Sequence, residues 1–493
     1  MEKQLKCVLM LSLKEMALRT VTVLLWNDSD TASVSKFRIP GFHTEESKKE
    51  WREIIEDKMK DKILKLELPE SLTKQVIDIV RPIGLQIRRW KDCQEDYLSN
   101  KNKKITLPNS VKLFWNTAGM IDYRKTAEEL IRCDALNVVQ RYKIACTNCL
   151  EDCIPLLWEK LPEERKMRFL RAGIPSPKLE LCWSYIIRGQ LSELDYLLRT
   201  SKRTLTSFNQ WAFERSVENG NKTATEYFFQ KLTHEEREAS LMRTVEALLR
   251  NRFRIKSKHL FRFRNEKLSD VSCYLLTLMT PEQQMEIFKK HPSGVLLRFL
   301  DWPWPDLFLE NAGLIWIFLP PSGYGDLLLN MASRFELSDH YFPKLFQEFF
   351  MQSPLDCKKY FVDQKSVFGT PASRFLSTFF RCEDSESVEV IFRNMDTADR
   401  VRLLSSDDVL RLFYFYMLKD LWYMVEVCLR EAALSREDMQ RLKEAFIECN
   451  FIGQVEWENR KFIRFFEFLD EADASADEEK KAQKRKLENC CPE

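Results

Sequence analysis

Apolar and polar residues between Ala145 and Phe229 follow a helical pattern that repeats along the chain. Each copy has a packed pair, two free positions and a turn residue, and apolar positions follow four, five, eight and nine residues after the turn. The three copies, given as pair and turn residue, are Ala145-Cys146 with Cys149, Tyr185-Ile186 with Gly189, and Ser216-Val217 with Gly220. A pattern that recurs about every 30 to 40 residues is typical of stacked helical repeats. It predicts helix pairs joined at these turn residues.

Five other places carry the signal of a helix start. An apolar residue is followed by Pro, Ser, Thr or Asp and then by acidic or amide side chains, which cap free backbone N–H groups and suit the helix dipole. The five begin at Leu161-Pro162, Leu232-Thr233, Met279-Thr280, Met395-Asp396 and Leu434-Ser435. Most of their spacings are close to multiples of the repeat length. Helical repeats are therefore predicted from about Tyr123 to Leu469.

The chain before the repeats predicts three further helical segments. Residues 1–26 have an apolar helical pattern that ends at Trp26. Residues 45–65 are charged with an apolar stripe on one side, and a third segment runs over 69–90. Residues 98–113 have the pattern of a linker or of short extended pieces. An N-terminal helical region thus precedes the repeats.

Prolines and charge divide the rest of the chain. The stretches 301–306 and 320–325 are rich in proline, which breaks helices. From Asp470 onward, acids and then bases follow one another without apolar periodicity, which predicts disorder. The predicted organisation is an N-terminal helical region (1–97), a linker (98–122), helical repeats (123–300), an irregular Trp/Pro joint (301–326), further repeats (327–469) and a disordered charged tail (470–493).

The composition favours helices packed on helices. Only 12 of the 493 residues are glycine, which argues against sheet-rich folds and Gly-rich phosphate loops. The predicted fold class is all-α, an elongated α-solenoid of roughly nine or ten antiparallel helix pairs behind an N-terminal helical cap. No stretch of 18 apolar residues occurs, so no membrane span is predicted. The 14 cysteines have irregular spacings and no secretory signal is recognised, so we expect reduced thiols and a cytoplasmic location.

Residues that could carry chemistry do not assemble into a known catalytic motif. The five histidines form no HExxH, and no GxSxG, GK[ST] or GxGxxG sequence is present, so we do not predict an enzyme or a cofactor. Cys146, Cys149 and Cys153 spell C-x-x-C-x-x-x-C, which could begin a zinc site. A structural zinc needs four ligands, and only Cys133 lies nearby. The repeat pattern explains all three as core and turn positions, so no metal is predicted.

The strongest charge feature is the basic stretch 250–267. Its bases alternate with phenylalanines, a combination that a nucleic-acid strand can use for phosphate contact and base stacking. The candidate basic patch consists of Arg250, Arg252, Arg254, Lys256, Lys258, Arg262 and Arg264. The near-neutral net charge of +2 favours the alternative of a basic helix pair that faces solvent or an acidic protein. A second basic run, 480–486, is similar to a nuclear localisation signal and leaves a nuclear location open.

The repeated turn resembles the ankyrin repeat. Gly189 and Gly220 match the glycine at which that family turns the chain between two short antiparallel helices, and Cys149 and Asp420 stand in its place elsewhere. Gly369-Thr370-Pro371-Ala372 is similar to the family's Thr-Pro-Leu-His opening, in which Thr caps a helix and Pro begins it. The resemblance implies a degenerate ankyrin-like array that binds other proteins.

The N-terminus resembles a SOCS box. Ser12-Leu13-x-x-x-Ala17-x-x-x-Val21 is similar to the helix by which SOCS-box proteins bind Elongin C, and Leu66-Glu67-Leu68-Pro69 resembles the segment that contacts a cullin. The resemblance implies that Leu13, Ala17 and Val21 bind Elongin C of an Elongin B/C pair, and that Leu68 and Pro69 bind the cullin. The protein would then be a substrate-recognition adaptor of a ubiquitin ligase.

A structural cap for the end of the repeat array is the alternative role of this region. The two roles differ in where one face of the helix over 12–26 points. That face carries Leu13, Met16, Ala17, Val21 and Leu24. In an adaptor this face points away from the protein and binds Elongin C, whereas in a cap it packs on the helices that follow.

Overall fold

Helices make up all the regular elements in the part of the chain that the structure describes. The computed structural model describes residues 8–27, 57–99, 105–107, 111–171, 178–202, 207–250, 258–336, 342–364, 369–448 and 462–470. Within these ranges an isolated β-bridge joins Trp115 and Ile121, and no residue is assigned to a strand. The prediction of an all-α fold is therefore confirmed.

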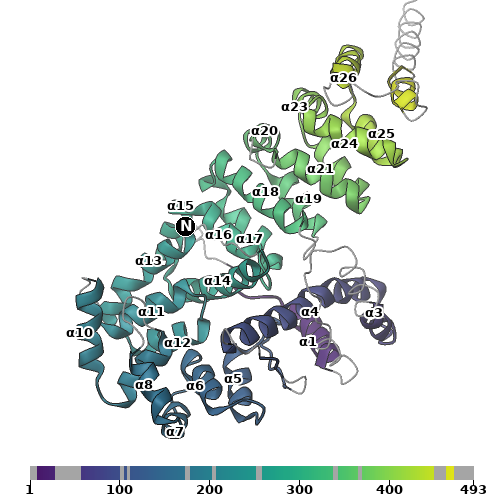
Figure 1. The fold of residues 1–493 in the computed structure, drawn as a ribbon. Coiled ribbons are helices and arrows are strands. Elements are labelled where there is room, and N and C mark those ends of the chain that lie inside the picture. The colour runs from purple at the N-terminus through teal and green to yellow at the C-terminus, as the bar shows by residue number, and fades with distance from the viewer. Residues whose placement is uncertain are drawn as a thin grey trace, which may run out of the picture. The chain divides into compact units, whose positions relative to one another are not determined.

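The chain divides into two compact units, and the division lies between Phe318 and Leu319. Unit 1 contains α1 (Leu13–Asn27), α3 (Asp57–Leu64), α4 (Glu70–Leu98), α5 (Tyr123–Arg132), α6 (Val138–Thr147), α7 (Ile154–Glu159), α8 (Glu163–Arg171), α9 (Leu179–Ile187), α10 (Leu191–Lys202), α11 (Phe208–Glu218), α12 (Lys222–Lys231), α13 (His234–Arg250), α14 (Lys258–Leu278), α15 (Pro281–Lys290), α16 (Pro292–Phe299), η3 (Pro305–Leu307), α17 (Phe308–Ile315) and η4 (Trp316–Phe318) (Figure 1).

The described elements of unit 2 are also helices. It contains α18 (Pro321–Glu336), α19 (Pro343–Gln352), α20 (Leu355–Asp363), α21 (Pro371–Cys382), α22 (Ser385–Arg393), α23 (Thr397–Leu404), α24 (Asp407–Leu418), α25 (Trp422–Ala432) and α26 (Arg436–Glu448), with a further helical stretch over 462–470. None of the helices that the structure describes in either unit combines the length and apolar character needed to cross a bilayer.

At each repeated turn of the sequence, an α-helix ends in a residue with the left-handed backbone conformation. Such a helix end, with the same hydrogen bond, occurs five times in the described chain. The turn residues have positive φ and are Cys149 (49°), Gly189 (70°), Gly220 (66°), Glu383 (53°) and Asp420 (61°). In each copy the N–H of the following residue donates to the carbonyl of the first residue of the packed pair, at 2.9–3.0 Å. This hydrogen bond from C″ to C3 defines the Schellman motif, which satisfies free carbonyls at a helix end.

Four of these turn residues match the predicted positions, and the fifth was missed. Phe379-Phe380 and Glu383, followed by Val388 and Ile391, have the same spacing as the other copies. Glutamate is uncommon in the left-handed region, so the residue type gave no signal of a turn there. The spacing of the apolar positions could have identified it.

The predicted helix starts coincide with α8, α13, α15, α23 and α26. At α15, the Thr280 hydroxyl accepts from the Gln283 N–H, and the Gln283 side-chain oxygen accepts from the Thr280 N–H. The two bonds form a capping box. At α23, Asp396 accepts from the Asp399 N–H at 2.8 Å. Thr370 likewise caps α21, where Pro371 is the first helical residue, as the predicted opening required.

Each helix that ends in the repeated turn packs on the helix that follows it. The pairs are α6 with α7, α9 with α10, α11 with α12, α21 with α22, and α24 with α25. Neighbouring pairs also meet, because α6 packs on α9 in unit 1 and α22 packs on α25 in unit 2. The core of unit 2 contains packed aromatic rings: Phe346 of α19 and Phe375 of α21 lie 4.2 Å apart, and both side chains are fully buried.

The structure corrects three predicted boundaries. The helix predicted over 1–26 begins at Leu13 in the described chain, because residues 8–12 are not helical. Residues 1–7 lie outside the described residues. The third segment continues as α4 to Leu98. The range 301–326 is not irregular throughout, since it contains α17 and the first turns of α18. Pro321 opens α18 instead of breaking it, because the first residue of a helix needs no N–H donor.

Two predicted segments lie outside the described residues. The first is most of the charged helix over 45–65, of which α3 is the described part. The second is the tail from 471 to 493, including the basic run 480–486.

Two turn glycines with similar φ differ in their surroundings and allow a matched test. A Cβ added at Gly220 would lie 2.9 Å from the Lys267 Cβ and 3.2 Å from the Leu268 N, both in α14, whereas one at Gly189 would meet nothing within 4 Å. We expect Gly189→Ala to cost about 1–2 kcal/mol, the penalty of the left-handed conformation. Gly220→Ala should cost clearly more, because α14 must also move. Urea unfolding of both variants measures the difference, and equal losses would contradict the close packing of this turn on α14.

Candidate functional site

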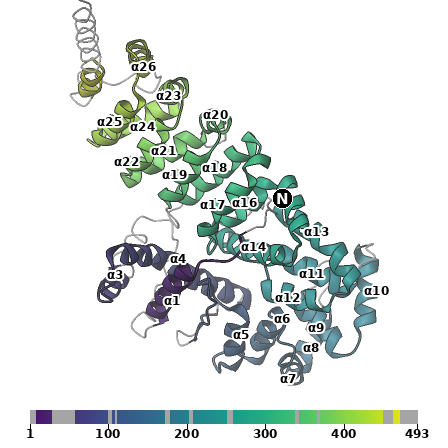
Figure 2. The same ribbon diagram turned by 180° about the vertical axis from the view of Figure 1, so that it is seen from behind.

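Helix α1 has one face that is packed into unit 1. Leu18, Val23 and Trp26 are buried there, with 8%, 7% and 4% of their surfaces exposed. They share a hydrophobic cluster with Met59 and Ile63 of α3, with Val76, Val80 and Ile83 of α4, and with Met120 and Trp302. Helices α1 and α3 therefore both pack on α4, and α1 lies beside α4 in both ribbon views (Figures 1 and 2).

The opposite side of α1 is apolar and exposed. Leu13 is 82% exposed and Leu24 is 64% exposed, Ala17 is exposed, and Val21 is half-buried. We call these four residues the outer face of α1. Met10, just before the helix, is 80% exposed. A group of exposed apolar side chains on one side of a packed helix is typical of a protein-binding surface.

A capping box sets the first turn of α1. The Ser12 N–H donates to the Glu15 carboxylate at 2.7 Å, and the Glu15 N–H donates to Ser12 Oγ at 3.2 Å. This reciprocal arrangement satisfies donors that the helix start leaves free. The capping box makes Leu13 the first helical residue of α1. The side chain that the SOCS-box resemblance predicts to bind Elongin C therefore lies at a defined helix end.

Arg19 attaches the inner side of α1 to the loop at Ala118 and to η3 of unit 1. Its side chain is 1% exposed and donates to the Ala118 carbonyl at 2.8 Å and to Asp306 Oδ2 at 2.5 Å. Its guanidinium also lies 4.5 Å from the centroid of the Trp302 ring. Burial lowers the pKa of Arg19, an effect that the Asp306 carboxylate partly offsets. A buried guanidinium with this set of partners fixes the rotation of α1 about its axis.

Two more contacts hold the ends of this segment. The Trp26 indole N–H donates to the Val80 carbonyl of α4 at 3.1 Å. Ahead of the helix, the Asn311 side chain accepts from the Val8 N–H at 3.0 Å and donates to the Val8 carbonyl at 2.9 Å. Sequence reasoning missed Arg19, Asp306 and Asn311. An arginine within an otherwise apolar helical stripe was the signal that could have identified the first of them.

The turn between α3 and α4 carries the second predicted contact. Pro69 is exposed and is the N-cap residue of α4, whereas Leu68 is half-buried and packs against the N-terminal cluster. Leu64 and Leu66 are 61% and 42% exposed, and Glu67 adopts a positive φ of 51°. The surface at this turn is thus formed by Leu64, Leu66 and Pro69, and Leu68 supports it from below.

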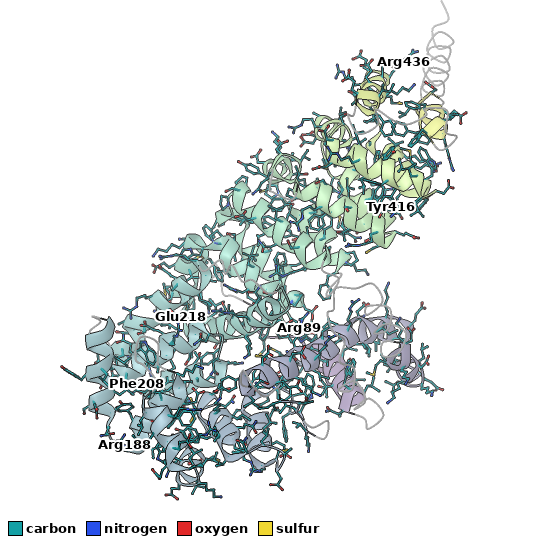
Figure 3. The ribbon with its side chains drawn as sticks, in the orientation of Figure 1. Arg89, Arg188, Phe208, Glu218, Tyr416 and Arg436 are labelled. Carbon is teal, nitrogen blue, oxygen red and sulfur yellow. The ribbon has the colours of Figure 1, made fainter. Side chains whose placement is uncertain are left out.

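Helix α4 is fastened to the repeats by buried polar groups. Arg89, labelled in Figure 3, forms an ion pair with Glu266 of α14, and their side chains are only 2% and 5% exposed. Nearer the end of α4, the Tyr97 hydroxyl donates to Glu180 Oε1 at 2.5 Å. Burial and the neighbouring Glu180 carboxylate raise the pKa of Tyr97. These contacts join α4 to α14 and α9.

The basic stretch is only partly within the described residues. Arg252, Arg254 and Lys256 lie outside them, and Lys258 and Arg262 belong to α14 but their side chains are not described. Arg250 forms an ion pair with Glu246. Arg264 donates to the Glu218 carbonyl at 3.2 Å, and burial lowers its pKa. Arg250 and Arg264 are thus engaged by unit 1 itself.

The cysteines of the C-x-x-C-x-x-x-C sequence occupy core and turn positions. Cys146 and Cys149 are buried, Cys153 is half-buried, and burial raises the pKa of all three thiols. Within the described ranges no three His, Cys, Asp or Glu side chains are grouped so as to hold a metal ion.

Comparison with known protein families and with curated proteins found no match to this chain. The interpretation of the site therefore depends on its own geometry.

Proposed function

We propose that the protein is a non-enzymatic interaction scaffold that recruits Elongin C through the outer face of α1. In this role it is a substrate-recognition adaptor of an Elongin–cullin ubiquitin ligase. The observation that carries the proposal is that Leu13 is 82% exposed on a helix whose other side packs into the hydrophobic cluster of unit 1. An amphipathic helix that offers an apolar face to a groove is a recurring mode of protein recognition.

The orientation of α1 favours an adaptor over a cap. A cap would pack Leu13, Ala17 and Leu24 on the helices that follow, but these three side chains are exposed. The helix instead packs through Leu18, Val23 and Trp26. Ala17 supports close approach of a partner helix, because its side chain leaves room beside Leu13. The exposed turn with Leu66 and Pro69 provides a separate surface for a cullin.

The repeats would supply the surface that binds the substrate. The five Schellman turns and the packing of successive pairs support a degenerate ankyrin-like array of antiparallel helices. Such arrays present long surfaces without a reactive cleft, which suits recognition of another protein rather than catalysis.

The direct test mixes the purified full-length chain with purified Elongin B and C at micromolar concentration on a sizing column. The proposal expects one complex that contains all three chains. Separate elution of the chain and the Elongin pair would exclude the ligase role and leave a protein-binding scaffold whose partner meets α1 in some other way.

A further inference from the structure

The outer face of α1 is held in place by residues that come about 300 positions later in the chain. Asn311 of α17 is fully buried and binds both backbone groups of Val8, with hydrogen bonds of 3.0 and 2.9 Å. The same amide also donates to the Leu307 carbonyl at 2.8 Å, within its own segment. Because one side chain satisfies the N–H and the C=O of a single residue, it fixes the path of the chain just before Met10 and Leu13.

A second link from the same later segment reaches the middle of the helix. Asp306 accepts from Arg19 at 2.5 Å, and the Trp302 ring faces the Arg19 guanidinium at 4.5 Å. The segment 302–311 therefore contacts the polypeptide at Val8 and at Arg19, on both sides of Leu13. We call these contacts the 302–311 clamp.

The clamp has a physical task that the hydrophobic cluster cannot perform. Helix α1 has 15 residues, which is marginal for an isolated helix in water. It is apolar on both sides, so hydrophobic packing alone does not select which side faces inward. The directional bonds of Arg19 do select it, because the guanidinium reaches Asp306 and the Ala118 carbonyl only when the outer face points outward.

We propose that Asn311 and Asp306 are positioning residues for partner docking: they hold the outer face of α1 toward solvent and make Elongin recruitment conditional on a folded 302–311 segment. This inference rests on the proposed function and deepens it. A partner that binds a helix already ordered and correctly rotated does not have to order it, so affinity is higher. Loss of the clamp should therefore weaken binding, although neither residue lies on the outer face.

The experiment compares four variants of the full chain. Asp306→Asn removes the counter-charge of Arg19, and Asn311→Ala removes both bonds to Val8. Asp306→Glu keeps the carboxylate and serves as the rescue, and Glu310→Ala changes the exposed neighbour of Asn311 on α17. Affinity for purified Elongin B/C is measured by titration, and amide hydrogen exchange is measured over α1 and, as an internal reference, over α11 and α12.

We expect Asp306→Asn and Asn311→Ala each to weaken Elongin binding at least about tenfold, a shift of about 1.4 kcal/mol in binding free energy. Exchange should rise in α1 and stay unchanged in α11 and α12. Asp306→Glu and Glu310→Ala should bind within about threefold of the parent. Unchanged affinity in both clamp variants, with a parent that binds, would overturn the inference.

Failure of the proposed function is distinguishable from failure of the clamp. If the parent chain does not bind Elongin B/C, the ligase role is wrong, and the exchange arm alone decides the clamp. Faster exchange confined to α1 in both variants would then support positioning by Asp306 and Asn311. Exchange that is unchanged in α1, or that rises equally in α11 and α12, would refute it.

Discussion

Leu13→Asp is expected to abolish Elongin B/C binding while the protein remains folded. Leu13 is 82% exposed, so a charge there meets water in the free protein, and its effect on stability should stay within about 0.5 kcal/mol. In the complex the same carboxylate would be buried in an apolar groove. Loss of a central apolar anchor typically costs 2 kcal/mol or more, and an unpaired buried charge adds to this, so binding should fall by about a hundredfold or more.

Two further variants separate the faces of the helix. Lys14→Ala alters an exposed neighbour of Leu13 and should leave both binding and melting temperature unchanged. Leu18→Asp places a charge in the buried cluster and should unfold the N-terminal region. Titration with Elongin B/C and thermal unfolding are measured for all three. A large loss of stability in Leu13→Asp would show that the outer face is packed in solution and would favour the cap.

The largest expected effect on stability comes from the buried ion pair between α4 and α14. Arg89→Ala removes the guanidinium that pairs with Glu266, whose side chain is only 5% exposed. Removing one partner of a buried pair typically costs about 3–5 kcal/mol, because the other charge stays desolvated. We expect a loss of this size in urea unfolding, together with faster hydrogen exchange along α4.

The double variant Arg89→Met with Glu266→Met tests the cause. Replacing both charges with apolar side chains removes the desolvation cost, so it should be close to neutral or more stable than the parent. Arg124→Ala is the matched control for an exposed pair in the same unit, since Arg124 and Glu128 are 55% and 40% exposed. It should cost no more than about 0.5 kcal/mol. If Arg89→Ala lowered the free energy of unfolding by no more than this, the ion pair between Arg89 and Glu266 would not stabilise the packing of α4 on α14.

Local features of the fold could be predicted because their causes are local. Thr280 and Asp396 cap helices through bonds to N–H groups three residues away, so residue type and spacing identify them directly. The repeated turn is similar, since its hydrogen bond closes over five residues. Even Cys149 and Asp420, which stand where other copies have glycine, could be placed from the surrounding apolar positions.

Glu383 is the copy of this motif for which only the spacing of the apolar positions was a signal. It adopts the left-handed conformation although neither its type nor a neighbouring glycine indicates a turn. The packing of α21 on α22 around Phe380 and Val388 holds it there, and a backbone penalty of about 1–2 kcal/mol is small beside the burial of such side chains. Tertiary contacts thus override a local preference.

The sequence alone was enough to predict the all-α class, four of the five repeated turns in the described chain, and which residues of the first helix share one face. It could not determine which side of that helix faces water, because α1 is apolar on both sides and either side satisfies the pattern. That choice depends on Arg19, whose partners Ala118, Trp302 and Asp306 are about 100 and 290 positions away. Contacts over such distances leave no periodic trace in a sequence, and only the tertiary structure brings these groups together around the helix.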